Sequence, residues 1–182
     1  MKNLIVFISC LLSAVFLLNS CSNLITNRLN LLNIETENEY KYTEELIDTI
    51  INSINEKDFD GIKNAFSENA VEVSKDLDDD IELLFDFIPE EITQRSDNYS
   101  PYTSESSSGG KKTKKCRLYY EVSVSDVVYT MLFIYCIRDD TDPKNEGLNT
   151  LAVTRGTNRE RFKSVGALGI DVLGKTDASV KF

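Results

Sequence analysis

The sequence predicts an α+β domain, with three N-terminal helices packed on one face of a curved antiparallel sheet. Between residues 41 and 88 the apolar residues recur at helical spacing. From residue 91 onward they alternate with polar residues or form short runs bounded by turn signals. Helices followed by strands are the order typical of α+β proteins. The 182-residue length leaves room for one such domain, expected over residues 41–182.

Three amphipathic segments account for the predicted helices. In residues 42–57 one stripe is made by Leu46, Ile47, Ile50, Ile51 and Ile54. Asp58 suits the N-cap of a second, short helix that carries Phe59, Ile62 and Phe66 inward. Ser67 or Asn69 is expected to cap a third helix, which continues to Ile88 and ends at Pro89.

Strands are predicted over residues 91–96, 116–124, 127–137 and 147–155, with a last apolar piece over 166–174. Residues 127–137 are apolar at both alternating sets of positions, which predicts a strand in the middle of the sheet. Residues 97–115 are rich in Ser, Gly and Lys and have no apolar pattern. They are predicted to form a long mobile loop.

The spacing of Cys116 and Cys136 allows two arrangements of the strands that carry them. A three-residue turn over 125–127 would place the two cysteines opposite one another, close enough for a disulfide. A two-residue turn would instead place Cys116 opposite Tyr135 and prevent the bridge. A disulfide and two buried free thiols therefore both stay open.

The first 20 residues read as a lipoprotein signal peptide. The apolar run from Leu4 to Leu18 would span only about 22 Å as a helix, short of the roughly 30 Å hydrocarbon core of a membrane. Leu18-Asn19-Ser20-Cys21 resembles the bacterial lipobox. The resemblance implies a diacylglyceryl thioether on Cys21, cleavage before that residue, and a lipidated tether over residues 21–40. Two acyl chains of palmitate type give stable anchoring, here expected at the outer face of the cell membrane.

Composition excludes several classes of site. The chain has no histidine, so a Ser-His or Cys-His nucleophile pair cannot form, and no catalytic residue and no cofactor are predicted. The net charge of −10 argues against a nucleic-acid partner. Asp76, Asp78 and Asp80 match the first ligands of a calcium loop, but Ile81 stands where the turn glycine belongs. A solvated helical face is favoured there, and no metal site is predicted.

Aromatic residues on the two central strands are the candidate lining of a ligand pocket. They are Tyr119, Tyr120, Tyr129, Met131, Phe133 and Tyr135. Core packing alone would also explain the apolar members of this set.

Three stretches carry a resemblance to a known family. "INEKDFDGIKNAFSENA", "DLDDDIELLFDFIPEEI" and "NEGLNTLAVTR" together resemble clostridial-type, Gram-positive lipoproteins of unknown function, known as domain of unknown function 5104. The resemblance covers about residues 40–175. It implies a cystatin-like cone of the kind shared by nuclear transport factor and ketosteroid isomerase, and it brings no established activity.

These observations predict a lipid-anchored extracytoplasmic binding or interaction domain without catalysis. Its partners would be the membrane, through diacylglyceryl-Cys21, and a small hydrophobic ligand or a protein. Two alternatives stay open. One is an isomerase- or dehydratase-type enzyme that uses the cone cavity, and the other is an accessory subunit of a membrane complex.

Overall fold

The computed structural model describes residues 37–96, 99, 101–165 and 168–173. The chain divides into two compact units, Met1–Thr43 and Glu44–Phe182. The predicted signal peptide, Cys21 and the tether up to residue 36 lie outside the described residues. Within the part that is described, no helix is both long enough and apolar enough to cross a membrane.

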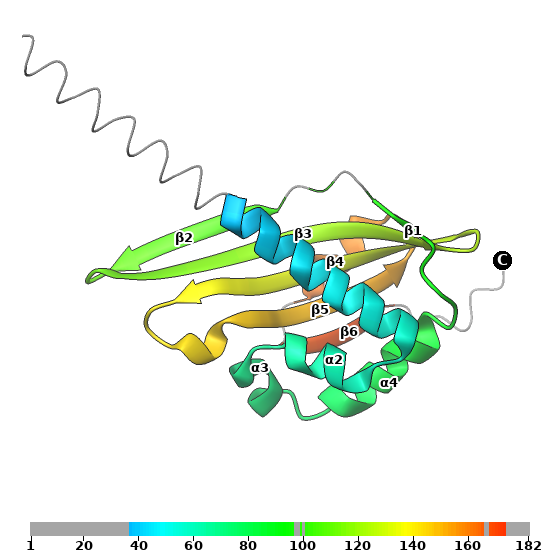
Figure 1. Cartoon of the computed structure of the whole chain (residues 1–182), viewed down its shortest axis with the longest axis horizontal. Helices are drawn as coiled ribbons and strands as arrows, with labels where there is room; N and C mark the ends of the chain where they lie inside the picture. The colour runs from blue at the N-terminus through cyan, green and yellow to red at the C-terminus, as the bar shows by residue number, and fades with distance from the viewer. Residues whose placement is uncertain (1–36, 97–98, 100, 166–167, 174–182) are drawn as a thin grey trace, which may run out of the picture. The chain divides into compact units, whose positions relative to one another are not determined.

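The described chain is an α+β fold of helices and an open, mixed sheet of six strands (Figure 1). Residues 37–56 form a long helix. The later elements are α2 (Phe59–Ala65), α3 (Glu68–Val73), α4 (Leu77–Phe87), β1 (Gln94–Arg95), β2 (Tyr102–Ser108), β3 (Lys111–Val124), β4 (Val127–Asp139), the 3-10 helix η1 (Pro143–Asn145), β5 (Gly147–Arg155), the 3-10 helix η2 (Arg159–Ser164) and β6 (Gly169–Leu173).

The first two predicted helices are confirmed. In the long helix the stripe Leu46, Ile47, Ile50, Ile51 and Ile54 is buried. The helix ends before Lys57, which has a positive φ of 54°. Asp58 then caps α2, because its side chain accepts a hydrogen bond from the Gly61 N–H at 3.0 Å.

The predicted third helix is two helices, α3 and α4, separated by residues 74–76. Ser67 caps α3 by accepting from the Ala70 N–H at 3.2 Å. The reason for the break is tertiary. The Ser74 side chain lies against the Cα of Gly169 in β6, so closely that a Cβ at Gly169 would meet the Ser74 Oγ at 2.4 Å. A helix continued through residue 74 would move that side chain.

Lys57 joins the end of the long helix to the end of α4. Its ammonium donates to the carbonyl oxygens of Phe85 at 3.1 Å and Ile88 at 2.8 Å, and it lies 5.3 Å from the centroid of the Phe85 ring. Such donors satisfy carbonyls that have no partner at a helix C-terminus. Burial lowers the pKa of Lys57, and the nearby Asp86 carboxylate opposes this effect.

The strands lie in the order β1-β3-β4-β5-β6, and β2 also pairs with β3. The prediction of a wholly antiparallel sheet is wrong for one pair, because β6 runs parallel to β5. The connection between these strands, residues 156–168, contains η2 and is long enough to return the chain to the starting end of the sheet.

The long loop predicted over residues 97–115 is also wrong for most of its length. Residues 102–108 form β2, and β3 already begins at Lys111. Gly109 and Gly110 form the turn with φ of 59° and 81°, the backbone that a tight hairpin requires. Because β2 is almost wholly exposed, it needs no apolar residues, and Glu105 pairs across the hairpin with Lys112 and Lys114.

Most residues of β4 and β5 are buried, and β4 lies in the middle of the sheet, as predicted for residues 127–137. On one face, Tyr129 of β4 meets the Phe87 ring of α4 edge to face at 5.6 Å. On the other, Leu132 and Ala152 pack with Phe162 of η2. Cover on both faces explains why so few residues of these strands are exposed.

A short junction connects the helical segment to β5. Phe66 forms a parallel bridge with Leu148, and the Ser67 N–H donates to the Leu148 carbonyl at 2.8 Å. The Ser67 hydroxyl donates to Asn149 Oδ1 at 2.7 Å in a buried position. Gly147 has a φ of 119°, and a Cβ there would lie 3.0 Å from the Ser67 nitrogen.

Replacing Gly147 with Ala should therefore destabilise the fold in two ways. The positive φ costs about 1–3 kcal/mol for a residue with a side chain, and the contact with Ser67 adds to it. Gly156→Ala is the matched control, because Gly156 has a φ of 83° with open space around its Cα. Urea unfolding followed by circular dichroism should show a larger loss for Gly147→Ala. Equal losses would show that the junction is not tightly packed.

Asp139 organises the connection from β4 to β5. Its Oδ1 accepts from the Thr141 and Asp142 N–H groups at 3.0 and 3.1 Å, and its Oδ2 accepts from Asn145 Nδ2 at 3.0 Å. These hydrogen bonds lower the pKa of Asp139, that from Asn145 most. Asn145 in turn accepts from Asn69 Nδ2 at 2.8 Å, so the connection is also tied to α3.

The lowered pKa predicts a pH-dependent contribution to stability. Because the folded pKa of Asp139 lies below the unfolded one, the stabilisation is complete above the unfolded pKa of about 3.9 and is lost as pH falls through the folded pKa. Asp139→Asn should lower the urea midpoint at pH 7, and the difference from wild type should shrink below about pH 4. Asp126→Asn, in the exposed β3–β4 turn, is the control. A difference that stays constant with pH would contradict this role of the carboxylate.

Candidate functional site

The edge of the sheet beside β3 is interrupted. β1 pairs with β3 up to Arg95 opposite Val122, and β2 resumes at Tyr102 opposite Arg117. Residues 118–121 of β3 lie between these two paired stretches. A hollow at this interruption, beside Tyr120 of β3, is the candidate site.

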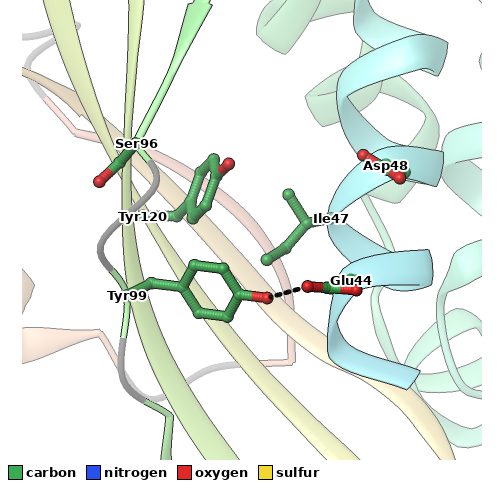
Figure 2. Close-up of a pocket in the computed structure, with 6 residues that line it drawn as sticks. All are labelled: Glu44, Ile47, Asp48, Ser96, Tyr99 and Tyr120. Carbon is green, nitrogen blue, oxygen red and sulfur yellow. Dashed lines mark hydrogen bonds between the residues drawn. The ribbon is translucent and has the colours of Figure 1, made fainter. Parts of the chain in front are cut away.

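We call this hollow the recess. It has a volume of about 300 Å³ and is lined by Glu44, Ile47, Asp48, Ser96, Tyr99 and Tyr120 (Figure 2). The first three come from the long helix, where residues three and four apart share a face. Ser96 and Tyr99 belong to the interruption, and Tyr120 belongs to β3. The recess is therefore built from three segments that are distant in the sequence.

Two tyrosine rings form one side of the recess. Their centroids are 5.5 Å apart and their planes make an angle of 64°. Tyr120 is only 5% exposed, so packing holds its ring in place. The Tyr99 hydroxyl donates to Glu44 Oε1 at 3.3 Å, and Figure 2 shows this bond spanning from the strand side to the helix. The two tyrosine rings and the Glu44 carboxylate therefore lie side by side in the recess.

The helix side of the recess carries two acidic groups. Asp48 accepts from Arg95 Nη1 at 2.5 Å, and Arg95 also donates to Asn52 Oδ1 at 3.0 Å. Glu44 receives the Tyr99 hydroxyl, and within the described residues it has no basic partner. Of the two acidic groups, Asp48 therefore has a basic partner among the described residues and Glu44 has none.

The structure separates the six residues predicted to line a pocket. Tyr120 lines the recess. Tyr129, Met131, Phe133 and Tyr135 are buried in the core, the last three with no exposed surface.

Tyr119 lies on the opposite face of the sheet from Tyr120. There its ring meets the edge of Phe162 at a centroid distance of 5.6 Å. The guanidinium groups of Arg117 and Arg159 lie 5.4 and 5.1 Å from the Tyr119 centroid. Tyr119 and Tyr120, although neighbours on β3, therefore line two different surfaces, because successive side chains of a strand point to opposite faces of the sheet.

The other recess residues were not predicted as site residues. The sequence predicts Ile47 only as part of a core stripe, and Tyr99 only as part of the loop over residues 97–115. Glu44 and Asp48 lie within the first predicted helix, outside its apolar stripe. The only signal in the sequence was the pair of tyrosines in an otherwise small and polar stretch after Arg95.

Cys116 and Cys136 are both buried, and no disulfide joins them. The β3–β4 turn has two residues, Ser125 and Asp126, so Cys116 lies opposite Tyr135 and Cys136 lies opposite Lys115. In this register the two sulfur atoms lie on different faces of the sheet. The three-residue turn that would have allowed a disulfide is therefore not the one observed. Burial raises the pKa of the Cys136 thiol, which keeps it protonated at neutral pH.

The acidic run after residue 75 lies at the start of a helix. Asp78, Asp79 and Asp80 occupy the first turn of α4, where negative charge is favoured by the helix dipole. Among the residues described, no three acidic or sulfur side chains come together as metal ligands.

A second hollow of about 430 Å³ lies beside the β2–β3 hairpin and is lined by Ser104, Glu105, Ser106, Thr113, Lys115, Asp139 and Thr141. The Asp139 carboxylate in this second hollow already accepts hydrogen bonds from Thr141, Asp142 and Asn145 of the β4–β5 connection.

The model of a family described as domain of unknown function (DUF5104) matches residues 49–156, more than half of the chain. The chain belongs to this family. A search of curated proteins found no match. The matched range contains the residues that hold the fold together. They are Asp58, Ser67, Asp139 and Gly147. Ser96, Tyr99 and Tyr120 of the recess also fall inside it, whereas Glu44, Ile47 and Asp48 precede its start.

The strand register predicts the behaviour of the thiols. Digestion of the full chain without reductant, after alkylation in denaturant, should give separate alkylated peptides containing Cys116 and Cys136. In the folded chain both should be alkylated slowly, because both are buried. A linked pair of peptides in the mass spectrum would show that the register is wrong.

Proposed function

We propose that this chain is a lipid-anchored, extracytoplasmic binding domain that holds a ligand in the recess and catalyses no reaction. The anchor is the diacylglyceryl group on Cys21, and the domain stands at the outer face of the cell membrane. The observation that carries the binding role is the recess itself, formed where the edge of the sheet is interrupted opposite the long helix.

The anchor rests on the pattern at the start of the chain. An apolar run of signal-peptide length ends in Leu18-Asn19-Ser20-Cys21, which has the branched and small residues that lipoprotein processing needs. The net charge of −10 repels anionic lipid and nucleic acid, so in this proposal the lipid alone holds the protein at the membrane. This agrees with the resemblance to Gram-positive lipoproteins.

The arrangement proposed for the domain is the cystatin-like cone, with helices on one face of a curved sheet. Contacts of Phe87 with Tyr129 and of Phe66 with Leu148 bring helical segments to the sheet as such a cone requires. Cones of this type leave a hollow between helix and sheet, and the recess occupies such a position. Its 300 Å³ suits a small ligand.

An enzyme of isomerase or dehydratase type has less support. It would need a carboxyl group with a raised pKa that projects into the recess beside a tyrosine. Glu44 and Asp48 of the recess are exposed. Asp171, whose pKa burial raises, lies on β6 and does not line the recess.

The accessory-subunit alternative calls for one large apolar patch. In the second unit, the exposed large apolar residues that the structure describes lie on separate elements. They are Val73 on α3, Tyr102 on β2, and Val127 and Val128 beside the β3–β4 turn. A small-ligand site therefore has the better support.

Cys21→Ser tests the anchor. In the native host, wild-type protein should be found in the membrane fraction, with an N-terminal peptide that begins at Cys21 and carries the mass of the lipid. The variant should be unprocessed or released. Cys10→Ser is the matched control and should leave lipidation unchanged, because too little of the apolar run precedes Cys10.

Protease added to intact cells tests the location, since an extracytoplasmic domain is degraded while cytoplasmic proteins survive. An identical, unmodified N-terminus in wild type and Cys21→Ser would rule out lipidation. Resistance of the domain in intact cells, together with degradation after lysis, would rule out the outer face.

A further inference from the structure

We propose that the recess binds a small organic ammonium compound, with the cation lying between the Tyr99 and Tyr120 rings and the Glu44 carboxylate. This inference rests on the proposed binding role of the recess and adds the chemical class of its ligand. It is drawn from the side chains in Figure 2, where aromatic groups face acidic groups across one small hollow.

The charge of the recess selects a cation. Glu44 and Asp48 both line it, and Arg95 neutralises only Asp48. Glu44 has the Tyr99 hydroxyl as a hydrogen-bond donor, and within the part of the chain described here it has no lysine or arginine beside it. An anionic ligand would be repelled at close range by the Glu44 carboxylate. A neutral ligand would bring no charge to Glu44, whereas an ammonium group would neutralise it.

The aromatic rings add a second attraction for the same charge. The negative face of an aromatic ring attracts a cation within about 6 Å of its centre, and sites for quaternary ammonium groups use several such rings. The Tyr99 and Tyr120 rings stand at 64° to one another with centroids 5.5 Å apart, so they present two differently directed surfaces. Ile47 provides the apolar contact that the carbon atoms of an organic cation need.

The geometry is held by contacts on both sides of the recess. Tyr120 is fixed by burial in β3, and Arg95 connects β1 to the long helix through Asp48 and Asn52. Tyr99 is joined to the helix by its hydrogen bond to Glu44. Because Glu44 and Asp48 are exposed, solvent weakens their attraction. We therefore expect a dissociation constant of about a millimolar, weak but saturable.

The test compares choline with 3,3-dimethylbutan-1-ol, which has the same shape and no charge. Each is titrated into the ¹⁵N-labelled full chain in a maltoside detergent, and the amide shifts of the residues around the recess are followed by NMR. Choline should saturate these shifts, and the neutral alcohol should bind about ten- to twenty-fivefold more weakly, because a cation–aromatic contact at an exposed site supplies about two- to fivefold and the Glu44 charge about fivefold.

Substitutions at the recess identify the groups responsible. Glu44→Gln should weaken choline binding about fivefold and leave binding of the alcohol unchanged. Glu45→Gln removes the same charge from the next residue, which is exposed and does not line the recess, and should match wild type. Tyr99→Phe keeps the ring and should retain most of the binding, whereas Tyr99→Leu should lose it. The spectra of the variants also report whether each is folded.

Phosphocholine distinguishes a free cation from a lipid headgroup. The acidic recess should bind phosphocholine more weakly than choline because of its phosphate. Tighter binding of phosphocholine would keep the ammonium site but assign it to a headgroup.

Equal affinity for choline and the neutral alcohol would overturn the inference while leaving the recess as a binding site. Absence of choline-dependent shifts at the recess would overturn it as well. Neither result bears on the proposed lipid anchor, which is tested separately by the mass of the N-terminal peptide.

Discussion

The fold depends on one hydrogen-bonded junction, where the Ser67 N–H meets the Leu148 carbonyl. Ser67 serves three partners there, since it also caps α3 and donates its hydroxyl to Asn149. The approach is close enough that Gly147 has no room for a side chain. Because a buried polar group without a partner is costly, the cap, the glycine and the asparagine must be present together. Ser67 and Gly147 are far apart in the chain, and both lie within residues 49–156, the part that matches the family.

The recess arises from a mismatch between the two edges that meet along β3. A continuous edge strand would have paired with residues 118–121 and left no hollow beside Tyr120. β1 stops at Arg95 and β2 begins at Tyr102, and Tyr99, which lies between them in the sequence, contacts the long helix through its hydrogen bond to Glu44. The helix then contributes Glu44 and Asp48, which face the recess because they are one turn apart. Local interruption of pairing and helical periodicity thus create an acidic, aromatic hollow on a protein that is already acidic.

Prediction from the sequence succeeded where local chemistry decides the structure. The apolar stripe of the long helix, the caps at Asp58 and Ser67, and β5 over residues 147–155 follow from periodicity and capping. It failed where pairing with a distant strand decides. The β2–β3 hairpin buries little, so apolar alternation could not reveal it, although Gly109-Gly110 is a turn signal in its own right. The break between α3 and α4 also depends on a distant residue, Gly169, which no helical pattern records.

The sequence by itself determined the α+β class, the absence of histidine chemistry, the acidic charge, and the candidate lipidation site at Cys21. Each of these is a property of composition or of neighbouring residues. The tertiary structure alone decided which face each strand residue occupies. With a turn one residue shorter than the disulfide required, Cys116 and Cys136 point to opposite faces, and Tyr119 and Tyr120 serve different surfaces. The lining of the recess was decided in the same way. Because the side chains of a strand alternate between two faces, a shift of one residue in the register exchanges the residues that lie on each face.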